Sequence, residues 1–174
     1  MTDGKTDQCG YRLEIGLVED QFSSDTCERP TWEDHDHCVW HAKVDGKTSE
    51  TFEDVAFDDD ARLNGAYLRG ATLVGLDWFA GTSLVSANLT GADIIGSDFS
   101  GADMRLATLT NVSGLNADFS DANLEGATFT DADLRRATLE GALLNETVLT
   151  DVTSAAGRTW ERRPCTSART SSRR

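Results

Sequence analysis

A large apolar residue recurs at every fifth position from residue 52 to residue 149, and this period constrains the fold more than any other feature of the sequence. From Ala117 the chain divides into ADFSD, ANLEG, ATFTD, ADLRR, ATLEG, ALLNE and TVLTD. Following the register back gives twenty units, nineteen of which carry a large apolar residue at this position. The positions are Phe52, Phe57, Leu63, Leu68, Leu73, Trp78, Leu84, Leu89, Ile94, Phe99, Met104, Leu109, Gly114, Phe119, Leu124, Phe129, Leu134, Leu139, Leu144 and Leu149.

A second position in each unit is reserved for a small residue. The residue two before each large one is Ala in thirteen units and Ser, Thr or Val in five more. A period of five fits neither the 3.6 residues of a helical turn nor the alternation of a strand. The pattern therefore predicts a coil of square cross-section, in which each side is one pentapeptide and stacked coils pair their backbones as in a sheet.

The A-[DN]-L-x-x pattern resembles that of the pentapeptide-repeat family across residues 50–153. The resemblance implies an all-β fold, a right-handed quadrilateral β-helix. Twenty units at four per coil predict about five coils, and a strand spacing of about 4.8 Å then predicts a rod about 24 Å long. A small N-terminal module is predicted at residues 1–49 and a basic tail at residues 154–174.

Three local departures from the period are expected to disturb the coils. Steps of six residues, from Phe57 to Leu63 and from Trp78 to Leu84, predict one-residue bulges. The second bulge follows Trp78, whose indole is too large for a standard interior position. Gly114 leaves one inward position empty, and we expect the neighbouring Val112 and Leu115 to fill it, with a cavity or a bent coil as the result.

The N-terminal module holds a group of metal-ligand side chains. The Cys38-x₂-His41 spacing is typical of a chelating turn, and three thiolates with one imidazole suit a closed, tetrahedral zinc site. A module of about fifty residues has little core of its own, so a metal would stabilise it. The segment also resembles Cys- and CxxH-bearing segments that precede the repeats in haloarchaeal members of the family, and this resemblance favours zinc. The predicted ligands are Cys9, Cys27, Cys38 and His41.

Two alternatives to zinc remain open for this module: free cysteines packed in a small core, and one disulfide with leftover thiols. His35 and His37, flanked by aspartates, are expected to be exposed, and Trp40 is expected to pack toward the end of the first coil.

Both ends of the chain carry further expectations. Alternation of Tyr11, Leu13 and Ile15 predicts a short strand. In the tail, Trp160 is expected to cover the last coil, and the chain beyond residue 164 is predicted to be disordered, with Cys165 a spare thiol.

Nothing in the repeats indicates catalysis. They contain no histidine to activate their many hydroxyl groups, and the chain has no glycine-rich phosphate loop. Carboxylate pairs such as Asp131 and Asp133 are expected from the repeat alphabet and are interpreted as solvated surface. We therefore predict that the protein is not an enzyme.

The chain is acidic, with a net charge of −14, and the charge is spread unevenly. Residues 1–51 carry −7, residues 52–151 carry −12 and residues 152–174 carry +5. Surfaces rich in Asp and poor in Lys resemble those of proteins from salt-loving archaea, in which charge maintains solubility. The repeats alone would carry one charge per about 2 Å of rod, close to the one per about 1.7 Å of duplex DNA.

Two functions are consistent with these features. The first is a non-catalytic scaffold that binds an unidentified protein partner, with structural zinc in its N-terminal cap. The alternative is an acidic DNA mimic that binds a DNA-processing enzyme such as DNA gyrase, as some members of the family do. Acidity outside the repeats favours the first. No direct binding of nucleic acid is expected, and the protein is predicted to be a monomer or homodimer. Without a long apolar run or a leader it is predicted to be cytoplasmic.

Overall fold

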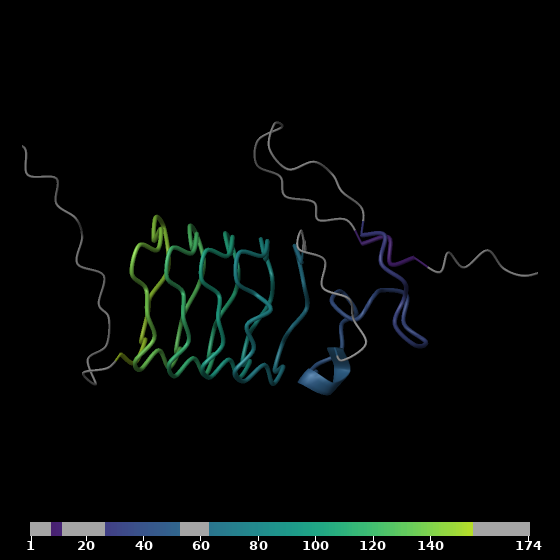
Figure 1. Ribbon diagram of the computed structural model, residues 1–174, viewed down its shortest axis with the longest axis horizontal. Coiled ribbons are helices and arrows are strands. Elements are labelled where there is room, and N and C mark those ends of the chain that lie inside the picture. The colour runs from purple at the N-terminus through teal and green to yellow at the C-terminus, as the bar shows by residue number, and fades with distance from the viewer. Residues whose placement is uncertain (1–7, 12–26, 53–62, 155–174) are drawn as a thin grey trace, which may run out of the picture.

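The computed structural model describes residues 8–11, 27–52 and 63–154 (Figure 1). Residues 63–154 form a stack of coils, and the other described residues lie at its N-terminal end. Within these ranges the one helical element is a 3₁₀ helix, η1 (Ser49–Phe52). None of the described ranges contains a helix with the length and apolar character needed to cross a lipid bilayer.

Successive coils are joined by parallel β-bridges that fall into four columns, one for each side of a quadrilateral coil. One column runs through Tyr67, Asn88, Thr108, Thr128 and Val148. Each bridge pairs single residues rather than extended strands, because the chain turns again after every pentapeptide. The predicted β-helix is thus built from stacked isolated bridges. The count of about five coils includes units at residues 53–62, outside the described residues, and stays a prediction.

The corners of the coils explain the polar alphabet of the repeats. The third residue of each four-residue turn has a positive φ, for example 67° at Gly91, 57° at Asn111 and 57° at Asp131, which lie at the same corner of successive coils. A type II turn requires this left-handed conformation, and Gly, Asn and Asp adopt it at the lowest cost. Their recurrence in the sequence is therefore a consequence of the turning backbone.

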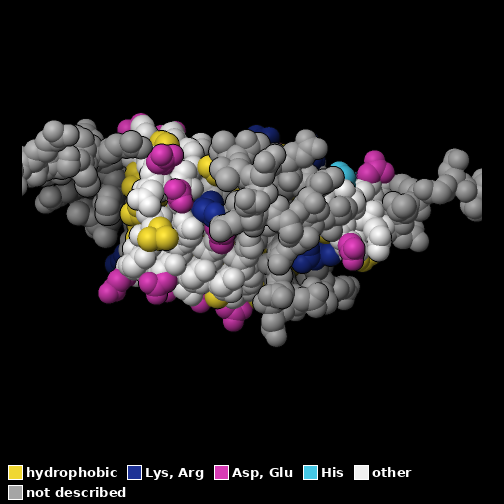
Figure 2. All heavy atoms as spheres, turned by 90° about the horizontal axis from the view of Figure 1, so that it is seen from above, with side chains coloured by type: hydrophobic (Ala, Val, Ile, Leu, Met, Phe, Trp, Pro, Cys, Tyr) yellow, Lys and Arg dark blue, Asp and Glu magenta, His cyan; other side chains and the backbone are white. Residues whose placement is uncertain are grey.

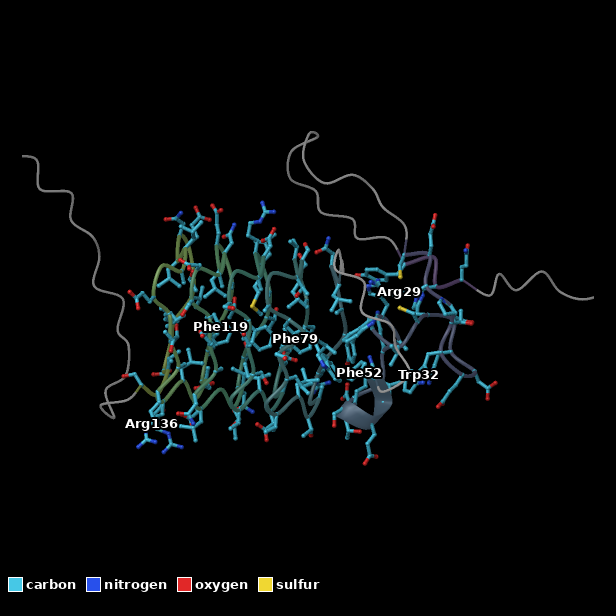
Figure 3. All side chains as sticks on the ribbon, in the orientation of Figure 1. Arg29, Trp32, Phe52, Phe79, Phe119 and Arg136 are labelled. Carbon is cyan, nitrogen blue, oxygen red and sulfur yellow. The ribbon has the colours of Figure 1, made fainter. Side chains whose placement is uncertain are left out.

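The interior is filled by the predicted large and small residues. Phe79, Phe99 and Phe119 form a stacked column, with ring centroids 4.9 Å and 5.3 Å apart. These distances match the strand spacing of about 4.8 Å, so each ring lies on the ring of the next coil. Figure 3 labels Phe79 and Phe119 in the interior of the coils. Burial of one such side chain stabilises the fold by about 1.5–3 kcal/mol.

The predicted interior position of Trp78 is wrong. Phe79 is fully buried in its place, whereas Trp78 is half-buried and meets Phe52 edge to face at 6.4 Å. The six-residue step therefore runs from Leu73 to Phe79, and not from Trp78 to Leu84 as predicted. The bridges record it, since Thr72 pairs 21 residues ahead, with Asp93, whereas Ser83 pairs 20 residues ahead. The earlier predicted bulge, between Phe57 and Leu63, lies outside the described residues.

The inward gap at Gly114 is closed differently from the prediction. A methyl group added to Gly114 would lie 2.9 Å from Leu134 Cδ2 and 3.6 Å from Ile94 Cδ1. Side chains of the two adjacent coils thus occupy the space. Val112 is buried at an ordinary small position, but Leu115 is half-exposed and does not fill the gap.

Residues 40–48 continue the stack by one further level at its N-terminal end. The Tyr67 amide donates to the Trp40 carbonyl at 2.7 Å, and the Thr72 amide donates to the Lys47 carbonyl at 2.7 Å. Trp40 is buried, stacks on Phe52 at 4.4 Å and meets Phe79 edge to face at 6.3 Å. Its predicted packing against the coil end is confirmed. The predicted division at residue 49 stays a prediction.

Candidate metal centre

Two short segments distant in sequence place the first two cysteines together. Residues 8–11 run antiparallel to residues 27–30, with the Cys9 amide donating to the Arg29 carbonyl at 2.7 Å and the Gly10 amide donating to the Cys27 carbonyl at 2.9 Å. The predicted strand began within this segment, but Leu13 and Ile15 lie outside the described residues. The pairing brings the side chains of Cys9 and Cys27 to one place.

A tight turn supplies the other two side chains. The amides of His41 and Ala42 both donate to the Cys38 carbonyl, at 3.0 Å and 2.9 Å. The turn directs both side chains to the same side, and Cys38 Sγ lies 3.3 Å from His41 Nδ1. The spacing that suggested a chelating turn in the sequence therefore forms one.

The four predicted ligand atoms converge, all within 4.8 Å of one another. Cys27 Sγ lies 3.8 Å from Cys38 Sγ, and Cys9 Sγ lies 3.4 Å from His41 Nδ1. A tetrahedral zinc site with bonds of about 2.3 Å to sulfur and 2.0–2.1 Å to nitrogen has edges of about 3.8 Å between sulfurs and about 3.5 Å between sulfur and nitrogen. The side chains could therefore hold a metal such as zinc with little rearrangement.

The imidazole of His41 is held in the orientation that a metal ligand needs. Its Nε2–H donates to the Asn64 carbonyl at 3.0 Å, which turns Nδ1 toward the thiols. The Tyr11 ring stacks on it at 4.0 Å with an interplanar angle of 10°. Asn64 is itself fixed, because its Oδ1 accepts hydrogen bonds from the Ser83 hydroxyl and the Val85 amide. The first coil thus orients a ligand of the cap.

Crowding of these groups perturbs their protonation. Hydrogen bonds from Cys38 and Cys9 lower the pKa of the Cys27 thiol, whereas the thiols of Cys27 and Cys9, together with burial, raise the pKa of Cys38. Burial lowers the pKa of His41, but contacts with Cys27 and Cys9 outweigh it and raise the pKa to about 9. Without a metal, His41 is therefore protonated at neutral pH, and binding of a divalent cation would displace its Nδ1 proton.

The other two histidines are not exposed as predicted, since both are half-buried. His37 Nδ1 donates to the Cys9 carbonyl at 3.0 Å, and His35 stacks on Trp32 at 4.9 Å. The chain folds back here, with the Trp32 amide donating to the His37 carbonyl. His37 thus supports the backbone of a ligand without joining the group of four.

Sequence reasoning missed Lys47, which is buried where the cap meets the first coil. Its ammonium group donates to the carbonyls of Ala42 at 2.7 Å and Tyr67 at 2.6 Å. Burial lowers the pKa of Lys47 to about 8, against the attraction of Cys38 and Asp45. Only the rarity of lysine in this chain could have drawn attention to it.

The remaining predictions of the sequence have separate outcomes. Cys9, Cys27 and Cys38 are free thiols, so no disulfide joins any two of them. Asp133 forms an exposed ion pair with Arg135 at 2.8 Å, and Asp131 is an exposed turn residue, in agreement with a solvated surface. Trp160 and Cys165 lie outside the described residues.

Comparison with known proteins identifies the repeats as pentapeptide repeats. The family model for pentapeptide repeats matches residues 79–111 and 116–151 in eight copies. A pentapeptide-repeat protein from the cyanobacterium Cyanothece 51142 is 30% identical over 59% of this chain and 68% of its own length, with a TM-score of 0.45. One from the thylakoid lumen of Arabidopsis thaliana is 27% identical over 63% of this chain and 66% of its own, with a TM-score of 0.31.

A more distant likeness is to QnrB1, a plasmid-mediated fluoroquinolone resistance protein. It is 18% identical over 52% of this chain and 44% of its own length, with a TM-score of 0.38, which carries no argument about function. No curated protein matches the chain. The family model matches within the coils and leaves the Cys/His cluster outside, so the resemblance of this segment to haloarchaeal relatives stays a prediction.

Proposed function

Because the chain belongs to the pentapeptide-repeat family, we propose that it is a non-catalytic scaffold that binds a protein partner and whose N-terminal end is closed by structural zinc. The observation that carries the zinc is the convergence of Cys9, Cys27, Cys38 and His41 at tetrahedral edge distances. Bound zinc would cross-link the paired segments 8–11 and 27–30 to the turn from Cys38 to His41. Four protein ligands leave no open coordination position for a substrate, which supports a structural role.

The position of the cluster supports a sealing role. His41 contacts the first coil through Asn64, and Trp40 covers the buried Phe79 at the coil end. An open end of a β-helix exposes both apolar side chains and unpaired backbone groups. Zinc would therefore hold in place the segment that keeps water from the first coil.

Metal analysis of protein purified without an affinity tag tests this proposal. We expect one zinc per chain, and we expect Cys38→Ser to lose it together with the thermal stability of the cap. Cys165→Ser is the matched control, because it removes a cysteine that is not among the four, and it should keep the metal. Folded protein that contains no zinc after purification in zinc-supplemented buffer would exclude the structural zinc.

One side of the coils supports the binding of a protein. Large apolar residues at the first turn position are Val74, Val85, Ile95 and Leu115, and elsewhere this position is polar or Ala. Val85 is buried, whereas Val74 is 47% exposed and the other two are half-exposed. The Gly75 amide donates to the Ile95 carbonyl and the Gly96 amide to the Leu115 carbonyl, so these three residues form one column.

We call Val74, Ile95 and Leu115 the apolar column, and we propose it as the contact with the partner in the cytoplasm. A photoreactive amino acid at residue 95 is expected to cross-link a discrete protein in cells of the native host. Residue 110 is the control, since Thr110 occupies the same turn position on another side of the coil. Equal labelling from the two positions would contradict a specific face.

A further inference from the structure

One ligand of the cluster differs from the other three in its access to solvent. Cys9, Cys38 and His41 are 3%, 2% and 3% exposed, whereas Cys27 is half-buried. Arg29 Nη1 donates a hydrogen bond to Cys27 Sγ at 3.8 Å, and Figure 3 shows Arg29 beside the sulfur atoms of the cap. A small oxidant in solvent would therefore reach Cys27 first, next to a guanidinium that can stabilise a departing anion.

A second thiol lies close enough to complete an oxidation. Cys38 Sγ is 3.8 Å from Cys27 Sγ, and a disulfide bond is 2.03–2.05 Å long, so the sulfurs need to approach by about 1.8 Å. Cys27 lies on the paired segment 27–30 and Cys38 opens the turn to His41, so both backbones are already held.

We propose that a peroxide converts Cys27 and Cys38 to a disulfide and thereby expels the metal, an inference that rests on the zinc cap proposed above. The Cys27 sulfur attacks one peroxide oxygen and the O–O bond breaks, which yields a sulfenic acid and a hydroxide ion. The Cys38 sulfur then attacks the Cys27 sulfur, the S–O bond breaks and a second hydroxide leaves. The two thiolates lose two electrons, the peroxide gains them, and the hydroxides take protons from solvent to form water.

Loss of zinc follows from the ligand count. The disulfide leaves Cys9 and His41 as the remaining members of the group, and two ligands do not hold a closed tetrahedral site. The coils of residues 63–154 pair with one another independently of the cluster, so they should persist. Oxidation would thus open the cap while the coils stay folded, and a thiol reductant with added zinc would restore the cap.

The test uses the full chain carrying Cys165→Ser, which leaves the three cysteines of the cluster. Zinc content is measured first, then hydrogen peroxide is added while a chromogenic chelator follows zinc release. Glu28 and Glu33 lie between Cys27 and Cys38, so cleavage at glutamate separates them for mass analysis of the linked peptides. We expect one zinc released per Cys27–Cys38 disulfide formed, and slower formation of that disulfide in Arg29→Gln.

The outcomes separate the two proposals. Absence of zinc before peroxide overturns the zinc cap. Zinc that stays bound under excess peroxide, or a disulfide that omits Cys27, overturns the inference and leaves the zinc cap standing. Release with Cys27 oxidised to sulfinic acid and no disulfide also overturns it, because Cys38 would not have resolved the sulfenic acid. None of these results requires a variant that removes a zinc ligand.

Discussion

Asn64 links the Cys/His cluster to the coils through both its backbone and its side chain. Its carbonyl accepts the His41 Nε2–H, and its Oδ1 accepts from Ser83 and Val85 in the next coil. In Asn64→Ala the carbonyl remains but loses its anchor, so His41 is oriented less well. Because residues that orient a metal ligand contribute 10–100-fold to affinity, we expect roughly a 10-fold weaker zinc affinity, measured by chelator competition.

Asn123→Ala is the matched control for Asn64. Within the described residues its Oδ1 accepts only the Glu125 amide, at 3.2 Å, at a turn well along the coils. Zinc affinity should be unchanged in this variant. An equal loss in the two variants would show that a general weakening of the coils, and not the orientation of His41, determines the affinity.

Lys47 stabilises the same junction by a different interaction. In Lys47→Met the partly buried Tyr67 carbonyl loses the ammonium donor that lies 2.6 Å away, and the buried Ala42 carbonyl keeps only the Val44 amide as a donor. A buried acceptor left without a partner costs about 1–3 kcal/mol, so we expect the free energy of unfolding to fall by that amount in urea titrations of the zinc-loaded protein. Lys43→Met, at an exposed position, should change it little. Similar losses in both variants would contradict this role.

If zinc closes the cap as proposed, the stability of the cap depends on metal, whereas the coils of residues 63–154 pair with one another. Removal of zinc is therefore expected to increase hydrogen exchange in residues 27–47 and at the Tyr67 amide, which donates to the Trp40 carbonyl. Amides between the Phe99 and Phe119 coils should keep their protection. Mass spectrometry of exchanged peptides measures both, and a uniform loss of protection would instead indicate a single cooperative unit.

The repeats were predictable from sequence because every unit carries the same pattern of one large and one small inward residue. The location of the bulge was not, since Trp78 and Phe79 are adjacent aromatic residues and only the ring stack with Phe99 selects between them. The ligand group was predictable from residue types and from the Cys38-x₂-His41 spacing. The backbone pairing of residues 8–11 with 27–30, which brings Cys9 to the cluster, depends on contacts that no local pattern records.

Asn64 and Lys47 escaped prediction for a related reason. Both act through carbonyl groups: the backbone carbonyl of Asn64 orients His41, and Lys47 binds the carbonyls of Ala42 and Tyr67. Every residue has a backbone carbonyl, so the sequence does not reveal which carbonyl a side chain binds. The exposure of His35 and His37 was wrong because their flanking aspartates suggested a solvated loop, whereas the chain folds onto Trp32 and Cys9 there.

For the molecule as a whole, acidity is the property that most invites a functional interpretation. Carboxylates are scattered along the visible surface of the coils in Figure 2, and some are neutralised locally, as Asp103 is by Arg105 and Asp133 is by Arg135. Residues 1–51 also carry −7. The negative charge is thus not confined to the rod, and residues 152–174 are instead basic, at +5.

We therefore expect the protein neither to inhibit DNA gyrase nor to protect it from a fluoroquinolone. Supercoiling of a relaxed plasmid, measured in concentrated salt across a protein titration, is the direct measurement. Bovine serum albumin, another acidic protein, controls for non-specific charge effects. Inhibition that depends on protein concentration and is absent with the control would favour the DNA-mimic alternative over the scaffold.

From Ser83 onward every bridge joins residues twenty positions apart. Duplication or deletion of one complete coil in this region would leave each remaining residue facing the same kind of neighbour, whereas a change of any other length would rotate the following chain onto the wrong side. Apart from single-residue bulges such as the one before Phe79, we therefore expect the length of this region to vary in whole coils of twenty residues. Related chains would then differ in length by one or more complete coils.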